Sequence, residues 1–167
     1  MICNRKMQEL LKQTNQNDIP IAKTLSIWVK KNDIGETFWG VGNFCGCVGR
    51  KPTSIHGKKL TDLEWDGNEI NINRWDADKS NIKTPCILID VVSDAFSIVM
   101  ELKSHLENEY ADTCFDIVLS VSEGVADVSP SATIRFYAVR DSYSYIYPDA
   151  NNLEEFNQPI LIELVNY

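Results

Sequence analysis

The chain carries a loop rich in tyrosine and aspartate, which holds Tyr143, Tyr145 and Tyr147 between Asp141 and Asp149. Aromatic faces attract Lys and Arg side chains by cation–π contact, and neighbouring carboxylates add ion pairs. This composition is suited to gripping a basic partner. An edge strand whose tyrosines pack on a sheet, with their hydroxyls in water, explains the same pattern, and the sequence alone leaves both readings open.

A second group of reactive side chains consists of Cys45, Cys47 and His56. Structural zinc sites use four ligands, commonly in paired knuckles, so one Cys-x-Cys with a single histidine is a poor match. Nucleophilic catalysis would need a base beside the thiol, which spacing alone does not supply. We therefore expect no catalysis, no cofactor and no metal. The alternative is a small cytoplasmic enzyme or metal-binding protein with a site near these three residues.

The stretch from Thr84 to Val121 has the clearest pattern of secondary structure. The apolar, β-branched run Pro85–Val92 predicts a strand buried on both faces. Helical spacing predicts a helix over Ala95–Tyr110, and alternation then predicts a strand over residues 115–121. We therefore expect a central β-α-β unit.

Other segments complete the expected fold. The pattern predicts an amphipathic helix over Arg5–Lys12, a hairpin with strands at residues 24–30 and 37–41, and an irregular region over residues 49–83 with a brief strand at Ile70 and Ile72. Later strands are expected over residues 132–139 and 159–165. We predict a single globular α+β domain over residues 1–167, with a mixed, mostly antiparallel sheet and one main helix packed on it.

The acidic residues are concentrated in the second half of the chain. The formal net charge is −8, and the part from Ser104 onward holds two arginines against eleven Asp and Glu, a net charge of −9. This balance argues against direct nucleic-acid binding, which depends on Lys and Arg. It fits either a solvated surface that keeps the protein soluble or a folded negative face for a basic partner.

The apolar runs, the amino-terminal residues and the cysteines of the sequence predict the cellular compartment of the protein. No apolar run approaches the roughly 20 residues of a membrane helix, and polar residues interrupt any secretory signal near the amino terminus. Five cysteines form no disulfide framework, which fits a reducing environment. We expect a cytoplasmic protein with no membrane contact.

The segment Tyr147-Pro-Asp-Ala-Asn-Asn-Leu-Glu-Glu-Phe-Asn-Gln-Pro-Ile-Leu-Ile-Glu163, which follows an aromatic strand, resembles small acidic immunity proteins of bacterial contact-dependent growth inhibition and polymorphic toxin systems. The resemblance covers the last third of the chain. It implies a cytoplasmic inhibitor that binds one cognate toxin domain, commonly a nuclease, and covers its active site or substrate surface. In some such families a hairpin of the toxin extends the sheet of the inhibitor.

Charge and resemblance point to the same partner, because a nuclease carries a basic surface that binds phosphates. We expect a bacterial toxin inhibitor that acts by stoichiometric occlusion without turnover. A non-catalytic adaptor in some other assembly is a further possibility. The residues predicted to contact the toxin are Asp141, Tyr143, Tyr145, Asp149, Glu154 and Glu155.

Overall fold

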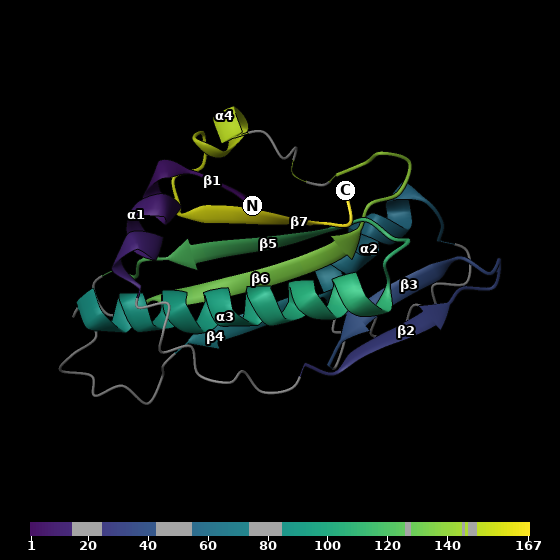
Figure 1. Ribbon diagram of the computed structural model, residues 1–167, viewed down its shortest axis with the longest axis horizontal. Helices are drawn as coiled ribbons and strands as arrows, with labels where there is room; N and C mark the ends of the chain where they lie inside the picture. Colours follow the sequence, from purple (N-terminus) through teal and green to yellow (C-terminus); the bar gives the residue numbers. More distant parts are fainter. Residues whose placement is uncertain (15–24, 43–54, 74–84, 126–127, 145, 147–149) are drawn as a thin grey trace.

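The computed structural model describes residues 1–14, 25–42, 55–73, 85–125, 128–144, 146 and 150–167 (Figure 1). In chain order the elements are β1 (Ile2–Cys3), α1 (Arg5–Gln13), β2 (Ile27–Lys31), β3 (Thr37–Val41), α2 (Lys58–Gly67), β4 (Glu69–Asn73), α3 (Pro85–Glu109), β5 (Phe115–Ser122), β6 (Ser131–Ala138), α4 (Ala150–Leu153) and β7 (Ile160–Val165). The α+β class is confirmed.

The strands form one sheet of five and one hairpin of two. The larger sheet has the order β1-β7-β5-β6-β4, and β2 pairs with β3 in the hairpin. Every pair among the named strands is antiparallel, so the expected mixture of directions is not found in the described residues. β5 lies at the centre of the sheet, where Ile117 faces Phe136 of β6 and Glu163 of β7.

The long helix α3 covers one face of the five-stranded sheet (Figure 1). Its residues Val91, Ala95, Val99, Leu102 and Leu106 are fully buried. They meet the face of β5 that the alternating pattern predicted, and this prediction is confirmed. The residues of that face are Phe115, Ile117, Leu119 and Val121.

The predicted strand over Pro85–Val92 is wrong, because these residues form the first turns of α3. The β-α-β unit that was expected to begin with this strand is therefore not formed, since Pro85–Val92 opens one continuous helix that leads into β5. An apolar run does not distinguish a strand buried on both faces from a helix buried on most of its surface. α3 is such a helix: Leu88, Ile89, Phe96 and Ile98 are also partly buried against the core.

The opposite face of the sheet has a smaller core. Val118, Tyr137, Ile160 and Ile162 pack there with Leu153 of α4. The edge of Trp65 from α2 meets the ring of Tyr137 at a centroid distance of 5.7 Å. Both faces of the sheet are therefore covered, α3 on one side and α2 with the α4 segment on the other.

The helix α2 lies in the stretch for which the sequence predicted no helix, and it joins the hairpin to the sheet. Its fully buried Glu64 accepts hydrogen bonds from the backbone N–H groups of Trp39 (3.0 Å) and Ala138 (2.8 Å). Asn68 donates to the carbonyl oxygens of Trp39 and Phe136 and accepts from the N–H of Val41. The unpaired edges of β3 and of the end of β6 are thus both bound to α2.

Candidate functional site

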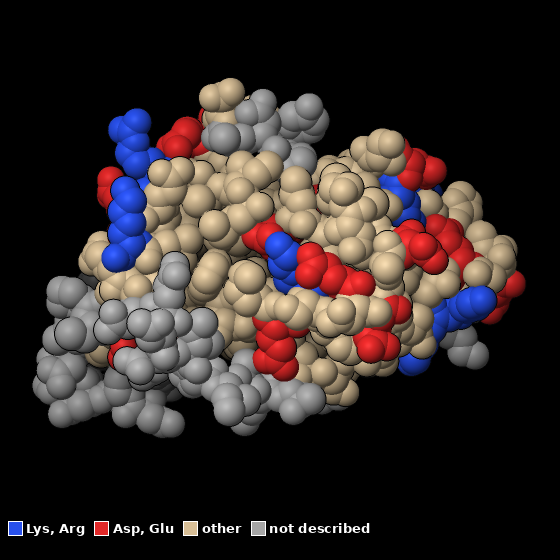
Figure 2. Space-filling view, in the orientation of Figure 1, with Lys and Arg blue, Asp and Glu red and all other residues tan. Residues whose placement is uncertain are grey.

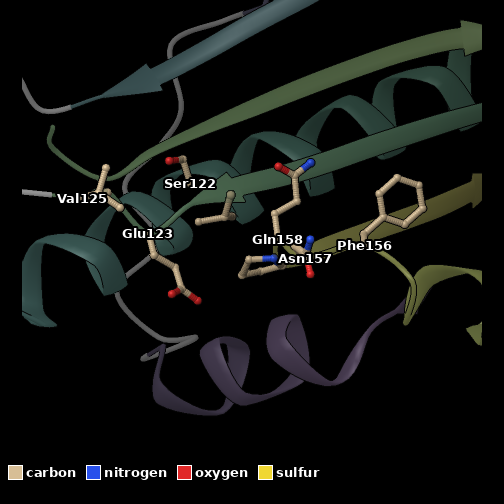
Figure 3. Close-up of a pocket in the computed structure, with 9 residues that line it drawn as sticks. Ser122, Glu123, Val125, Phe156, Asn157 and Gln158 are labelled. Carbon is tan, nitrogen blue, oxygen red and sulfur yellow. The ribbon is translucent and has the colours of Figure 1, made fainter.

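An open pocket with a volume of about 500 Å³ lies where β5 ends and β7 begins (Figure 3). We call it the β5–β7 pocket, and it is lined by residues 121–125 and 156–159. The two lining segments are held together by a hydrogen bond from the N–H of Val121 to the carbonyl oxygen of Pro159, at 3.0 Å. Glu123 lies on one side and Phe156 on the other, with Gln158 between them (Figure 3).

Asn4 fixes the second lining segment in place. Its side chain is buried and makes four hydrogen bonds that satisfy the amide completely. The Oδ1 atom accepts from the N–H groups of Met7 (3.1 Å) and Ile160 (3.2 Å), so Asn4 is also the N-cap of α1. The Nδ2 atom donates to the carbonyl oxygens of Leu153 (3.3 Å) and Gln158 (2.9 Å).

Gly124 shapes the first lining segment. It has a φ of +77°, and a Cβ atom there would lie 2.5 Å from the carbonyl oxygen of Val128. Only glycine permits this conformation and this close approach. The turn brings Val125 and Val128 into an isolated antiparallel bridge, with a hydrogen bond of 2.8 Å from the N–H of Val128 to the carbonyl of Val125.

The surroundings of the pocket combine exposed apolar side chains with carboxylates. Val125 is 74% exposed, Val128 is 59% exposed and Phe156 is 38% exposed. Glu123, Glu154 and Glu155 are exposed in the same two segments of chain. Exposed apolar groups ringed by charge are typical of protein–protein contact surfaces.

The predicted contact residues fall into two places. Glu154 and Glu155 come directly before Phe156, and Glu154 accepts a hydrogen bond of 2.8 Å from the N–H of Arg5 at the start of α1. Asp141 and Tyr143 belong to a turn beside α2, at the other end of the sheet (Figure 1). The structure therefore does not bring these two pairs together. Tyr145 and Asp149 lie outside the described residues.

The ring of Tyr143 already forms a cation–π contact within the chain. The Nζ atom of Lys58 lies 4.0 Å from the centre of its ring, and its hydroxyl donates to Asp62 at 3.4 Å. Asp141 and Ser142 have φ angles of +53° and +58°, which make the turn before Tyr143 tight. The Tyr143 side chain therefore already contacts two residues of α2.

Among the described residues from Ser104 onward, the exposed carboxylates separate into two groups at opposite ends of the sheet (Figure 1). Glu107, Glu109, Asp112 and Asp141 lie towards the end where α3 stops, and Glu123, Glu154 and Glu155 lie around the pocket. Two further carboxylates are buried, those of Asp116 and Glu163. Figure 2 shows acidic side chains in separate groups with Lys and Arg between them, so the visible face is not a continuous acidic surface.

A family model described as the Uncharacterized protein PM0498 family matches residues 2–166. The chain belongs to this family. No curated protein and no solved structure matches it. The match to the PM0498 family covers both lining segments of the pocket, Asn4 and the residues of the α2 junction.

The alternative site near Cys45, Cys47 and His56 is described only at its histidine. His56 is exposed and precedes α2, whereas both cysteines lie outside the described residues. Among the residues that the structure does describe, no three His, Cys, Asp or Glu side chains are placed to hold a metal ion. In the same part of the chain, no helix has the length and apolar content of a membrane span.

Three hydroxyl groups surround the buried carboxylate of Asp116 beside the smaller core. Its carboxylate accepts hydrogen bonds from Tyr137 (2.8 Å), Ser144 (2.5 Å) and Tyr167 (2.5 Å). Burial raises the pKa of both tyrosines, and the neighbouring Asp116 carboxylate raises each further. None of these residues lines the β5–β7 pocket, and we assign the cluster to stability.

Sequence reasoning missed Glu123, Val125 and Phe156 as site residues, and also the role of Asn4. The signal for Asn4 was present, because asparagine immediately before an amphipathic helix is a preferred N-cap. The signal for the pocket was weaker. A Glu-Gly-Val turn after a strand predicts a connection, and nothing in the spacing pairs it with a segment more than thirty residues later.

Proposed function

We propose that this protein is a non-catalytic immunity protein that binds and neutralises a cognate bacterial toxin domain. The resemblance of residues 147–163 to immunity proteins supports this proposal. It is also supported by the position of that segment, in which Phe156 lines the β5–β7 pocket directly after the exposed Glu154 and Glu155. The inhibitor acts in the cytoplasm by covering the toxin, without turnover.

The observation that carries the proposal is the pairing of apolar and acidic groups at one end of the sheet. Val125 and Phe156 offer apolar area, while Glu123 and Glu155 are exposed carboxylates. Neither carboxylate has a hydrogen bond or ion pair with another described residue. Free carboxylates beside apolar area complement the basic surface with which a nuclease holds phosphates. We therefore place the main contact here, with the Asp141–Tyr143 turn as a separate, second surface.

The test first asks whether the gene immediately upstream encodes a secreted protein that ends in a basic toxin domain, and then co-expresses that domain with this protein. The proposal expects restored growth and a complex of one inhibitor with one toxin domain in isothermal titration calorimetry. Growth arrest that persists at equal expression, with no complex formed by the purified proteins, would exclude this function.

A pair of matched charge reversals locates the contact. The double variant Glu123→Lys and Glu155→Lys should reduce the association rate by about tenfold or more at low salt, because steering by charge is lost. The control, Glu109→Lys and Asp112→Lys, makes the same charge change at two exposed carboxylates at the other end of the sheet and should retain near-normal association. Equal slowing in both variants would indicate net charge alone and would remove the pocket from the interface.

A further inference from the structure

We propose that the β5–β7 pocket is a receptor for one arginine side chain of the partner protein. This inference rests on the proposed function for the identity of the partner, but its chemistry is argued from the pocket itself. The chain supplies a carboxylate at one side of an open hollow, an apolar floor, and amide groups along the wall. These are the three features that a guanidinium group on an apolar stem requires.

The carboxylate is Glu123, which is exposed and has no hydrogen bond or ion pair with another described residue. A guanidinium presents paired N–H donors that match both oxygens of one carboxylate. Lys6 is a cation that does reach the lining segment, and its Nζ donates to the backbone carbonyl of Asn157 rather than to Glu123. The carboxylate is therefore available for a cation from outside.

The floor and wall suit the rest of an arginine side chain. Val121 and Pro159 are buried residues that line the bottom of the pocket, where three methylene groups can lie against them. Gln158 stands between Glu123 and Phe156, and its side-chain oxygen can accept an N–H that the carboxylate leaves unpaired (Figure 3). Phe156 supplies a ring beside the same hollow, and guanidinium groups stack on aromatic faces.

The backbone of both lining segments is held in place by contacts behind the pocket. Asn4 fixes the carbonyl of Gln158, and Gly124 allows the tight turn that carries Glu123 and Val125. A backbone held in this way loses less entropy when a side chain enters the pocket.

The test uses the free protein and small probes, so it does not depend on the toxin. Nα-acetyl-arginine amide is titrated into ¹⁵N-labelled protein, and Nα-acetyl-citrulline amide serves as the neutral probe of the same shape. We expect saturable shifts at the backbone amides of Gly124, Val125 and Gln158 with the arginine probe. Because a solvent-exposed ion pair contributes modestly, affinity should fall by about threefold or more with citrulline or with Glu123→Gln.

The matched control is Glu109→Gln, which removes one exposed carboxylate at the other end of the sheet and should leave the titration unchanged. Equal shifts with both probes, or shifts in Glu123→Gln that match those of the unaltered protein, would overturn the inference. A toxin complex that tolerates Glu123→Gln, together with no arginine shifts, would overturn it while leaving the proposed function intact. Arginine shifts at the pocket in a protein that binds no toxin would support the pocket and reject the function.

Discussion

Arg140 and Glu64 form a two-pronged ion pair, with N···O distances of 2.7 and 2.9 Å, between the end of β6 and α2. Arg140 also donates to the carbonyl oxygen of Thr37 in the hairpin at 2.9 Å and pairs with Glu36 at 3.2 Å. Burial raises the pKa of Glu64, while Arg140 and two backbone N–H groups stabilise its charged form. One buried carboxylate thus organises contacts to three elements.

Replacing Glu64 should therefore be costly. Glu64→Ala leaves the Arg140 charge and the N–H groups of Trp39 and Ala138 without their acceptor, and we expect a loss of about 3–5 kcal/mol in the free energy of unfolding. Chemical denaturation measures it. Asp66→Ala is the control, since Asp66 is an exposed carboxylate of the same helix, and its effect should stay within about 0.5 kcal/mol. Equal midpoints for Glu64→Ala and the unaltered protein would mean that the hairpin is held by other contacts.

Gly40 of β3 leaves room for the indole of Trp28. A Cβ atom at position 40 would lie 2.0 Å from Cζ2 of Trp28, so Gly40→Ala must displace the ring from the hairpin. We expect a loss of about 1–3 kcal/mol and a red shift of tryptophan fluorescence. Gly42→Ala is the contrast, because its φ of +54° adds backbone strain while no atom lies within 4 Å of the new Cβ. It should lower stability by about 1–2 kcal/mol without moving the emission.

Replacing Asn4 with aspartate, which has nearly the same shape, should lower the stability of the protein. Asn4→Asp keeps the cap on Met7 but turns a second oxygen towards the carbonyls of Leu153 and Gln158, which the Nδ2 atom now satisfies. Unpaired buried acceptors and repulsion between oxygens should lower the free energy of unfolding by about 2 kcal/mol or more.

Asn152→Ala provides a control for the Asn4 variant, because Asn152 is an exposed residue of α4 beside Leu153, whose carbonyl Asn4 binds. Thermal unfolding compares the two. An Asn4→Asp protein with the melting temperature of Asn152→Ala would show that the four hydrogen bonds add little.

The raised pKa of the Tyr137 hydroxyl predicts that the protein loses stability at alkaline pH. Burial, followed by the nearby Asp116 carboxylate, raises the pKa of Tyr137 in the folded protein, whereas an unfolded tyrosine ionises near pH 10. This stabilising contribution is therefore complete below about pH 10 and is lost as pH rises towards the folded pKa. Its limiting slope is about 1.4 kcal/mol per pH unit for one group.

Tyr137→Phe tests the alkaline prediction. The variant should start about 1 kcal/mol less stable because it lacks the hydrogen bond to Asp116, and its stability should then fall less steeply above pH 10. The slopes come from urea unfolding at a series of pH values. Parallel slopes for the two proteins would assign the alkaline loss to other groups.

The sequence predicted the strand β5 and the face that it turns towards α3. Phe115, Ile117, Leu119 and Val121 recur at every second position and share that face, although Val118 on the opposite face is buried as well. The hairpin was also predicted, since turn residues separate two short strands. These patterns are local and depend on only two neighbouring layers.

The sequence failed where burial is shared among several elements. Pro85–Val92 was assigned to a strand because a helix buried on most sides has no polar stripe to mark its period. α2 was missed because it buries polar groups, Thr61 and Glu64, which a pattern of apolar residues does not count. The pocket was missed because its two segments meet only through the pairing of β5 with β7.

The junction at α2 has a consequence for association with other chains. A strand edge normally offers a row of N–H and C=O groups on which a foreign strand can assemble. The side chains of Glu64 and Asn68 form hydrogen bonds with those backbone groups on β3 and at the end of β6. They take the place of a strand between the two edges. If α2 unfolds locally, the N–H and C=O groups of both strand edges become free to pair with a strand of another chain. Aggregation should then begin at the α2 junction.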